Sequence, residues 1–244
     1  MSDTSDNTKS IETIELTKSY GRNIAVKDVS IKLVWGDTLS VIGPNGSGKS
    51  TLIKIISGIT RPDSGISNIA GMDISKANNN IRRLIGVVTH DTLLYEGLTG
   101  FENLQFAARI FGLDRIEERI NNVTSKMHLT ELLHVKVGAL SHGLQKRFSI
   151  ARALLHEPKI LLMDEPDSGL DQESLDILDS IILDYSRTHH SVLITTHNIQ
   201  RAIDLSNRIA IMSRGIIKHE EDIDNSANYE SLRQVYSTCT RDVP

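Results

Sequence analysis

The sequence predicts an α/β fold that is interrupted by a block of helices. Three observations lead to this expectation: strand-like apolar patterns at both ends of the chain, a glycine-rich segment between a strand and a helix, and helical spacing in the middle. Both strand-bearing parts are expected to form one sheet, with the helical block packed at its edge.

The part that precedes the helical block reads as strands separated by turns. Strands are expected at residues 11–16, 29–33 and 38–42. A helix is expected from Thr51 to Ser57, where Gly58 stops it. Dense turn residues from Arg61 to Gly71 predict short strands joined by tight turns. A turn at residues 78–80 precedes a helix that starts near Ile81.

Strands return after the helical block of residues 101–155. The continuous apolar runs Ile160–Met163 and Val192–Thr195 are typical of strands buried between helices. A helix is expected around residues 175–185, a last strand at 208–212, and a short helix near 229–235. We therefore expect a loose tail at 1–9, a single domain at 10–220 and a C-terminal tail at 221–244. Within the domain, the α/β core takes residues 10–90 and 156–220 and the helical subdomain takes 91–155.

Composition limits the partners and the compartment. With 27 basic and 31 acidic side chains, the net charge is −4, so no nucleic-acid partner is expected. The longest apolar runs span a few residues, whereas a membrane span needs about 20. The N-terminus lacks the pattern of a signal peptide, and Cys239 is the single cysteine. These features predict a cytoplasmic protein that reaches the membrane only through a partner.

The glycine-rich segment Gly43-Pro44-Asn45-Gly46-Ser47-Gly48-Lys49-Ser50, followed by Thr51, matches G-x-x-x-x-G-K-[ST]. Its glycines let backbone N–H groups point at phosphate oxygens, and the helix start adds a partial positive charge. Lys49 is expected to reach the β- and γ-phosphates, and the Ser50 hydroxyl is expected to ligate Mg²⁺. The segment alone predicts only a nucleoside-triphosphate site.

Two carboxylates end the expected buried strand at residues 160–163. Asp164 is placed to hold Mg²⁺ through water, because a hard cation prefers oxygen ligands. Glu165, one residue later, can face the γ-phosphate and orient or deprotonate an attacking water. Together with the phosphate loop, this pair predicts hydrolysis.

The segment Leu140-Ser141-His142-Gly143-Leu144-Gln145 begins an amphipathic helix. Ser141 is a good N-cap, and a helix start with a hydroxyl and a glycine amide is a second anion site. Taken alone, an ordinary capped helix is the simpler interpretation of this segment.

The order of the motifs resembles that of the ABC-type ATPase family. The phosphate loop is followed by Leu-Ser-x-Gly at 140–143, Asp-Glu at 164–165, Ser-Gly-Leu-Asp at 168–171 and Thr-His at 196–197. The likeness runs from Leu16 to about His219. It implies a P-loop NTPase core of the RecA-like type, an N-terminal antiparallel β-subdomain and an inserted α-helical subdomain. It also implies ATP and Mg²⁺ at the site.

The resemblance assigns further residues. Ser141 and Gly143 would face the γ-phosphate held by a second subunit, so that two ATP molecules lie in a head-to-tail homodimer. Asp171 would end the loop that joins the two sites, and His197 would contact the γ-phosphate. Tyr20 matches the aromatic residue that stacks on adenine, although a packed surface tyrosine remains the alternative.

Two departures from the family pattern matter. Members usually carry Gln where this chain has His90, and an imidazole nitrogen is a poorer Mg²⁺ ligand than an amide oxygen. His90 is therefore expected to act through water or to relay contact with a membrane partner. The second departure is His142 and Leu144, where Gly and Gln are commoner, and a solvated histidine is the preferred interpretation at 142.

Within the family, the stretch His90–Tyr95, with Leu98-Thr99 and Glu102-Asn103-Leu104, looks like the ATP-binding subunit of the haem exporter of cytochrome c maturation. The implied protein is an ATPase subunit on the inner face of the cell membrane that powers a separate permease. The alternatives are the ATPase subunit of another exporter, for drugs, lipids or polysaccharides, and a soluble ABC ATPase without a transport role.

Overall fold

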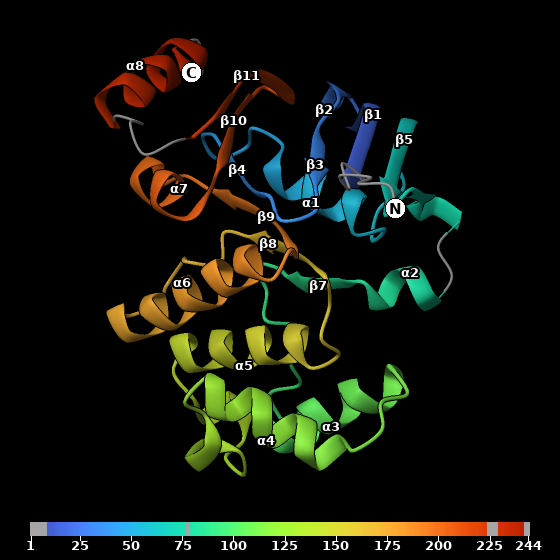
Figure 1. Ribbon diagram of the computed structural model, residues 1–244, viewed down its shortest axis with the longest axis vertical. Helices are drawn as coiled ribbons and strands as arrows, with labels where there is room; N and C mark the ends of the chain where they lie inside the picture. The colour runs from blue at the N-terminus through green and yellow to red at the C-terminus, as the bar shows by residue number, and fades with distance from the viewer. Residues whose placement is uncertain (1–8, 77–78, 224–228, 242–244) are drawn as a thin grey trace, which may run out of the picture.

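A computed structural model of the protein describes residues 9–76, 79–223 and 229–241. The expected N-terminal tail lies almost entirely outside these residues. In the described part, one six-stranded sheet forms the centre, a second antiparallel sheet lies beside it, and a group of helices lies at the opposite end (Figure 1).

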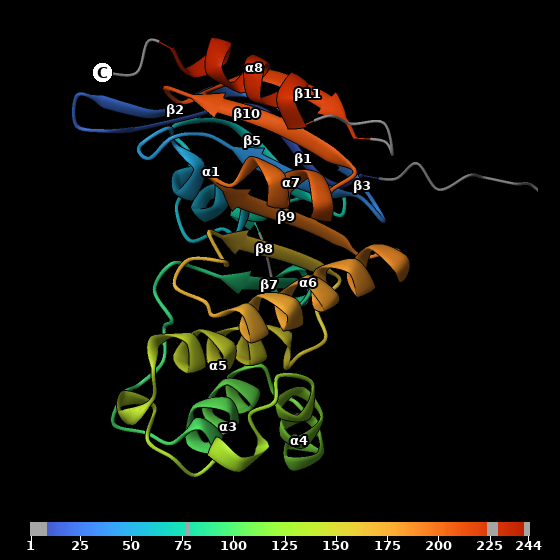
Figure 2. The same cartoon turned by 90° about the vertical axis from the view of Figure 1, so that its left-hand side faces the viewer.

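The central sheet has the strand order β11-β10-β4-β9-β8-β7. Its strands are β4 (Thr38–Ile42), β7 (Ile85–Val88), β8 (Ile160–Asp164), β9 (Ser191–Thr196), β10 (Arg208–Ser213) and β11 (Ile216–Asp222). The five strands from β10 to β7 are parallel, and β11 adds an antiparallel edge. Figure 2 shows β10, β9, β8 and β7 in descending order toward the helical group. Strands from both ends of the chain therefore share one sheet, as predicted.

Alternation along the central strands explains their continuous apolar runs. In β8, Ile160 and Leu162 pack in the core on one face of the sheet, while Leu161 and Met163 pack in the core on the other. Successive side chains of a strand point to opposite faces, so both sets must be apolar when both faces are covered.

The second sheet is antiparallel and has the order β2-β1-β5-β6, with β3 also paired to β1. Its strands are β1 (Lys9–Tyr20), β2 (Asn23–Val29), β3 (Lys32–Val34), β5 (Ser64–Ile69) and β6 (Met72–Asp73). The sequence predicted one strand at 29–33, but β2 ends at Val29 and β3 begins at Lys32. The Thr13 hydroxyl donates to the Val29 carbonyl and accepts from the Ile31 amide, which replaces the ladder at this break.

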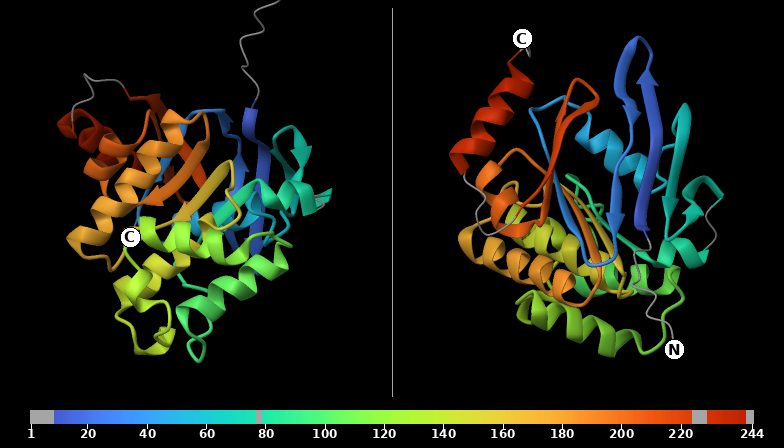
Figure 3. Two further views of the ribbon diagram at one scale, coloured as in Figure 1. Left: turned by 60° about the horizontal axis from the view of Figure 1, so that its bottom comes forward. Right: turned by 45° about the horizontal axis from the view of Figure 1, so that its top comes forward.

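Helix α1 (Lys49–Ile56) lies between the two sheets (Figure 3). Leu52, Ile53, Ile55 and Ile56 are fully buried in the core that both sheets share. A helix apolar on nearly all sides is the pattern of a helix enclosed in a core. The first residue of α1 is Lys49, so this packing fixes the end of the phosphate loop.

The helical group contains α3 (Gly100–Ile110), α4 (Ile116–Lys126) and α5 (His142–Leu154), with 3₁₀ turns at Thr130–Leu132 and Val137–Ala139. Helix α3 starts with a full capping box between Thr99 and Glu102. Phe148 of α5 is fully buried and fills the space beside Gly100, where a Cβ atom would lie 2.3 Å from its ring. Helix α2 (Asn79–Arg83) and a 3₁₀ turn (Ile74–Lys76) lead into β7.

Helices α6 (Gln172–Arg187) and α7 (Ile199–Leu205) cover the face of the central sheet opposite α1. The sequence placed residues 221–244 outside the domain as a tail. In the structure β11 continues to Asp222, and α8 (Tyr229–Thr240) packs Leu232 against Ile209 and Ile211 of β10. This helix is longer than the expected one at 229–235.

Candidate active site

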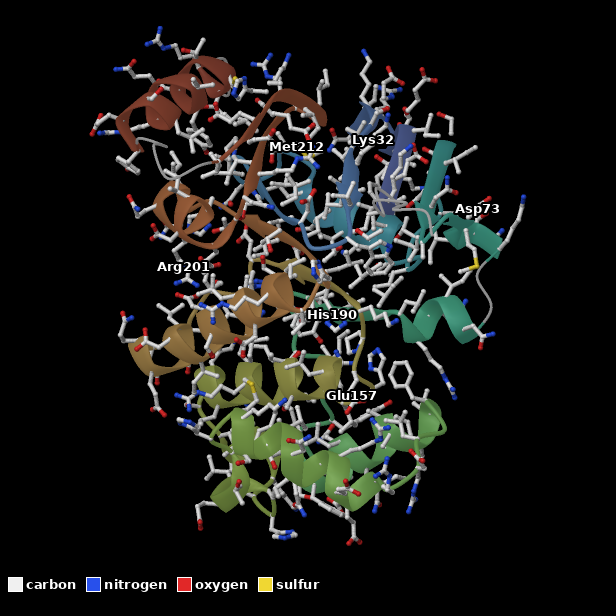
Figure 4. The ribbon with its side chains drawn as sticks, in the orientation of Figure 1. Lys32, Asp73, Glu157, His190, Arg201 and Met212 are labelled. Atoms are coloured by element: carbon white, nitrogen blue, oxygen red, sulfur yellow. The ribbon has the colours of Figure 1, made fainter. Side chains whose placement is uncertain are left out.

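The phosphate loop joins β4 to α1 and packs against β2 and against the end of β10. Gly48 has a φ of +109°, and a Cβ atom there would lie 2.1 Å from the Ala25 carbonyl oxygen. A Cβ atom on Gly43 would lie 2.2 Å from the carbonyl oxygen of Met212, which Figure 4 labels on β10. The Gly215 amide also donates to the Ser47 carbonyl at 2.8 Å. Only glycine fits at loop positions 43 and 48.

Lys49 lies under the loop with its side chain 4% exposed. Its Nζ donates to the carbonyl oxygens of Gly43 at 2.8 Å and Pro44 at 3.1 Å. The same atom lies 3.4 Å from Oε1 of Glu165. The ammonium is thus fixed at the loop, where a phosphate group would need a positive charge.

Asp164 ends β8 and is 4% exposed. Its Oδ1 accepts hydrogen bonds from Ser50 at 3.0 Å and from Thr195 of β9 at 2.7 Å. Because neighbouring parallel strands end at the same edge of the sheet, the carboxylate meets the first turn of α1 there. Asp164 and Ser50, predicted as magnesium ligands, are therefore adjacent.

Glu165 turns away from β8 with a φ of +44°, a left-handed conformation that is uncommon outside glycine. Its amide donates to both the carbonyl and the hydroxyl oxygen of Thr195, at 3.0 and 3.1 Å. The carboxylate lies 3.4 Å from Lys49 Nζ and 3.8 Å from Nδ1 of His197. The turn therefore places Glu165 beside the phosphate loop, with the second predicted catalytic side chain, His197, on its other side.

A cleft of about 450 Å³ opens between these groups. The residues that line it are Tyr20, Asn23, Ala25, Asn45, Gly46, Ser47, Gly48, Lys49, Ser50, Thr51, His90, Asp164 and Glu165. Tyr20 is 51% exposed, with Lys18 Nζ 5.8 Å from its ring centre, so its outer face is free to stack on a base. The cleft thus has a phosphate end and an aromatic end.

The oxygen atoms at the phosphate end fit Mg²⁺. The Ser50 hydroxyl and the Asp164 carboxylate are hard donors, and Mg²⁺ at phosphate sites is commonly bound by one or two carboxylates plus phosphate oxygens. Bound there, Mg²⁺ would neutralise charge on the phosphate oxygens. His90 lines the same cleft, and its role as a ligand stays a prediction.

Ser141 and Gly143 lie away from this cleft, at the start of α5. The Ser141 hydroxyl accepts from the Leu144 amide at 3.4 Å, so it caps the helix as predicted. Gly143 faces the 168–171 loop, because a Cβ atom on it would lie 3.8 Å from the Gly169 carbonyl. Among the residues that the structure describes, the Ser141–Gly143 segment does not line the cleft at the phosphate loop of the same chain.

Asp171 caps α6 by accepting from the Ser174 amide at 2.9 Å. Hydrogen bonding with the Ser174 side chain, then with the Ser174 amide and with Arg147, holds the pKa of the Asp171 carboxyl below its usual range. The loop before it is fixed at Asp167, which accepts from Thr196 and pairs with Arg201 at 3.3 Å. Figure 4 labels Arg201 between α7 and α6, where it also binds Asp179.

Two buried cations of α5 were missed by the sequence analysis. Arg147 binds Ser174 at 2.6 Å and the carboxylates of Asp171 and Glu173, which ties α5 to the start of α6 and the loop before it. Lys146 binds on another side of α5, to the carbonyl oxygens of Thr89 and His90. In the sequence Lys146 and Arg147 look like two ordinary solvated cations. Only the packing of α5 on both of its sides reveals that they are buried.

Fold and loop together define a P-loop protein that binds a nucleoside triphosphate. The chain also matches the ABC transporter family model over residues 26–168, which is more than half of its length. It belongs to the ABC transporter family, as an ATP-binding subunit. The predicted fold class and the family resemblance are thereby confirmed.

Curated relatives of several kinds are similar to this chain. It is 35% identical to the linearmycin resistance ATP-binding protein of Bacillus subtilis, over 82% of this chain and 65% of that protein. It is 31% identical to the ABC transporter ATP-binding protein NatA of the same organism, over 87% and 89%. The chain thus spans less than two thirds of the linearmycin-resistance protein. The doxorubicin resistance ATP-binding protein of Mycobacterium tuberculosis is 33% identical, over 82% and 62%.

Solved structures agree on the fold. An ATP-binding subunit of an ABC transporter superposes with a TM-score of 0.84 at 26% identity, over 93% of this chain and 99% of that one. A dimeric ATP-binding cassette in a post-hydrolysis state, bound to ADP and phosphate, superposes with a TM-score of 0.81 at 27% identity, over 88% and 99%. In the part of this chain that the structure describes, no helix has the length and apolar character needed to cross a membrane.

Proposed function

We propose that this chain hydrolyses ATP and thereby drives a separate membrane permease. The observation that carries the proposal is the position of Glu165, whose carboxylate lies between Lys49 and His197 at the phosphate end of the cleft. A carboxylate at this point can take the proton of a water molecule that attacks the γ-phosphate. The chain is proposed to act at the cytoplasmic face of the membrane.

Each side chain at the phosphate end has a separate role in this proposal. Lys49 and the loop amides hold the phosphates, and Ser50 and Asp164 hold Mg²⁺. Glu165 orients and deprotonates water, while His197 donates toward the γ-phosphate from its exposed position. The Glu165 amide donates two hydrogen bonds to Thr195. These hold Glu165 in its left-handed conformation and so orient its carboxylate.

Replacing Glu165 tests hydrolysis directly. Glu165→Gln keeps the size of the side chain but removes the base, so ATP hydrolysis is expected to fall by at least about 100-fold. ATP affinity is expected to change by less than about threefold, because the phosphate contacts remain. Phosphate release and calorimetric ATP titration give the two values. Glu117→Gln, at an exposed glutamate of α4, is the control; wild-type turnover by Glu165→Gln would remove Glu165 from this role.

An exposed apolar patch supports a permease partner. Tyr95, Phe106 and Ile110 form this α3 patch, and Ile110 is 68% exposed; Leu93, two positions before Tyr95, is exposed as well. The Tyr95 and Phe106 rings pack edge to face with centres 5.5 Å apart. A cluster of large apolar side chains at the surface marks an interaction site, and a cytoplasmic segment of a permease is the partner that we propose for it.

The cargo is proposed to be an amphipathic organic compound that is exported. Two of the relatives are named for resistance to linearmycin and doxorubicin, which supports this class. Haem export is a second candidate, supported by the stretch His90–Tyr95 with Glu102-Asn103-Leu104. The membrane protein that co-purifies with this chain distinguishes the two. If a strain without the gene assembles c-type cytochromes normally, haem export is wrong.

A further inference from the structure

Lys146 is a fully buried ammonium in the middle of α5. The residue is 1% exposed, although its neighbours at the start of the same helix face solvent. Its Nζ donates to the carbonyl oxygen of Thr89 at 2.8 Å and to that of His90 at 3.5 Å. A buried charge is costly unless hydrogen bonds compensate for it, so these two acceptors account for its position.

The two acceptors lie at a sensitive point of the cleft. Thr89 and His90 directly follow β7, the strand beside β8, which carries Asp164. His90 lines the cleft, and the Thr89 hydroxyl donates to the Asp91 carbonyl at 2.6 Å, which closes a tight turn. Helix α5 begins at His142, next to Ser141. One side chain therefore connects the helix of the Ser141 segment to the wall of the nucleotide cleft.

Carboxylates at and near the cleft also act on the charge of Lys146. Burial lowers the pKa of Lys146, while Asp164, Asp167, Asp91 and Glu165 act in the opposite direction. Two of these four carboxylates are the ones assigned to magnesium and to the attacking water. The ammonium thus lies within the field of the reacting groups without lining the cleft itself.

We propose that Lys146 is a positioning residue for ATP hydrolysis, which fixes the Thr89–His90 turn to α5 by donating to its two carbonyl oxygens. The inference rests on the proposed hydrolytic function. Through this connection, a displacement of α5 moves the wall of the cleft that His90 lines. The helix that reaches toward a second subunit and the site that this chain holds therefore adjust together.

Two replacements separate positioning from packing. Lys146→Met keeps the length and the apolar stem but removes the donors and the charge, whereas Lys146→Gln keeps a neutral donor. The Lys146→Met variant is expected to be the more stable of the two, since apolar replacement of a buried charge is often neutral or stabilising. The Lys146→Gln variant is expected to turn over ATP faster, because only Gln can still donate a hydrogen bond to the turn.

The measurements are kcat, KM for ATP and the thermal midpoint of the purified full chain. Lys146→Met is expected to lower kcat by at least about tenfold with KM within about twofold, and Lys146→Gln is expected to recover part of the loss. Amide exchange of the turn is expected to rise in Lys146→Met. Wild-type kcat in Lys146→Met, or a Gln variant no more active than Met, overturns the proposal.

The Glu165→Gln experiment keeps the two proposals apart. If the wild-type chain hydrolyses ATP and Glu165→Gln does not, then an active Lys146→Met variant refutes only the positioning role. If Glu165→Gln turns over normally, the proposed function fails whatever Lys146 does. Lys126→Met, at an exposed lysine of α4, is the matched control and is expected to keep wild-type kcat.

Discussion

At Gly48 the loop backbone has two separate reasons to exclude a side chain. Its φ of +109° lies beyond the left-handed region that other residues tolerate, and the Ala25 carbonyl occupies the place of a Cβ atom. Gly71 shares a positive φ, +78°, but a Cβ atom on it would have no other atom within 4 Å. Comparing alanine substitutions at Gly48 and Gly71 therefore distinguishes the effect of a steric clash from that of backbone strain alone.

Gly48→Ala is expected to weaken ATP binding by at least about tenfold, because the loop must move away from Ala25 and its amides leave the phosphates. Gly71→Ala adds only backbone strain of about 1–2 kcal/mol and is expected to leave ATP affinity unchanged. Calorimetric titration measures the affinity, and thermal unfolding measures the strain. Equal ATP affinity of Gly48→Ala and wild type would contradict the geometry.

Residues that line the cleft were easier to predict than buried residues that contact its walls from outside. Lys49, Asp164 and Glu165 stand in short local patterns whose chemistry is explicit. Lys146 and Arg147 gain their roles from carbonyls and carboxylates that lie 24 or more positions away in the chain. No local pattern records such contacts, because they depend on how α5 packs between β7 and α6.

At the scale of elements, His156 and Phe111 form a joint between the core and the helical group. Their rings stack with centres 4.0 Å apart, Nε2 of His156 donates to the Ile85 carbonyl, and Arg83 donates to the Phe111 carbonyl. The other imidazole nitrogen, Nδ1, is buried without a hydrogen-bond partner among the described residues. Burial lowers the pKa of His156, and the charges of Arg152 and Arg83 act in the same direction.

Because of His156, we expect the free energy of unfolding to decrease as the pH is lowered. Because the folded-state pKa is depressed, the unfolded chain takes up the proton first, and stability is lost as pH falls below about 6.5, the ordinary histidine value. The loss from one such group is at most about 1.4 kcal/mol per pH unit. His156→Phe keeps the stacking and is expected to reduce the slope between pH 7 and 5. Urea unfolding measures it, with His134→Phe, an exposed ring beside Phe101, as the control; equal slopes in all three proteins contradict the prediction.

Elements with strong periodicity were predicted well, and junctions were not. The strands at 160–163 and 192–195 lie where expected, because burial on both faces leaves a continuous apolar run. The strand at 38–42 also lies where expected, as the strand that runs into the phosphate loop. The break between β2 and β3 depends on one threonine hydroxyl from β1, which periodicity does not reveal. Helix α8 was underestimated because it buries one narrow face, around Leu232, on α7 and β10.

At the scale of the whole molecule, the separation of two predicted site segments is the main feature. The residues that line the cleft include the phosphate loop but not Ser141 or Gly143. A second copy that supplies this segment is consistent with the similar cassettes, one of which was solved as a dimer with a TM-score of 0.82 at 27% identity. A head-to-tail pair would contain two such composite sites, as expected for an interface with two-fold symmetry.

Dimer formation by the Glu165→Gln protein is therefore expected to require both ATP and Ser141. In that background, Ser141→Arg places a long cation where the hydroxyl would face the partner's phosphate, and it is expected to raise the dimer dissociation constant at least about tenfold. ATP binding by the separate chains is expected to persist, because each phosphate loop is intact. Ser125→Arg, at an exposed position of α4, gives the matched control. Sedimentation with and without ATP reports the association, and an undiminished ATP-dependent dimer in Ser141→Arg would show that the second site segment plays no part in it.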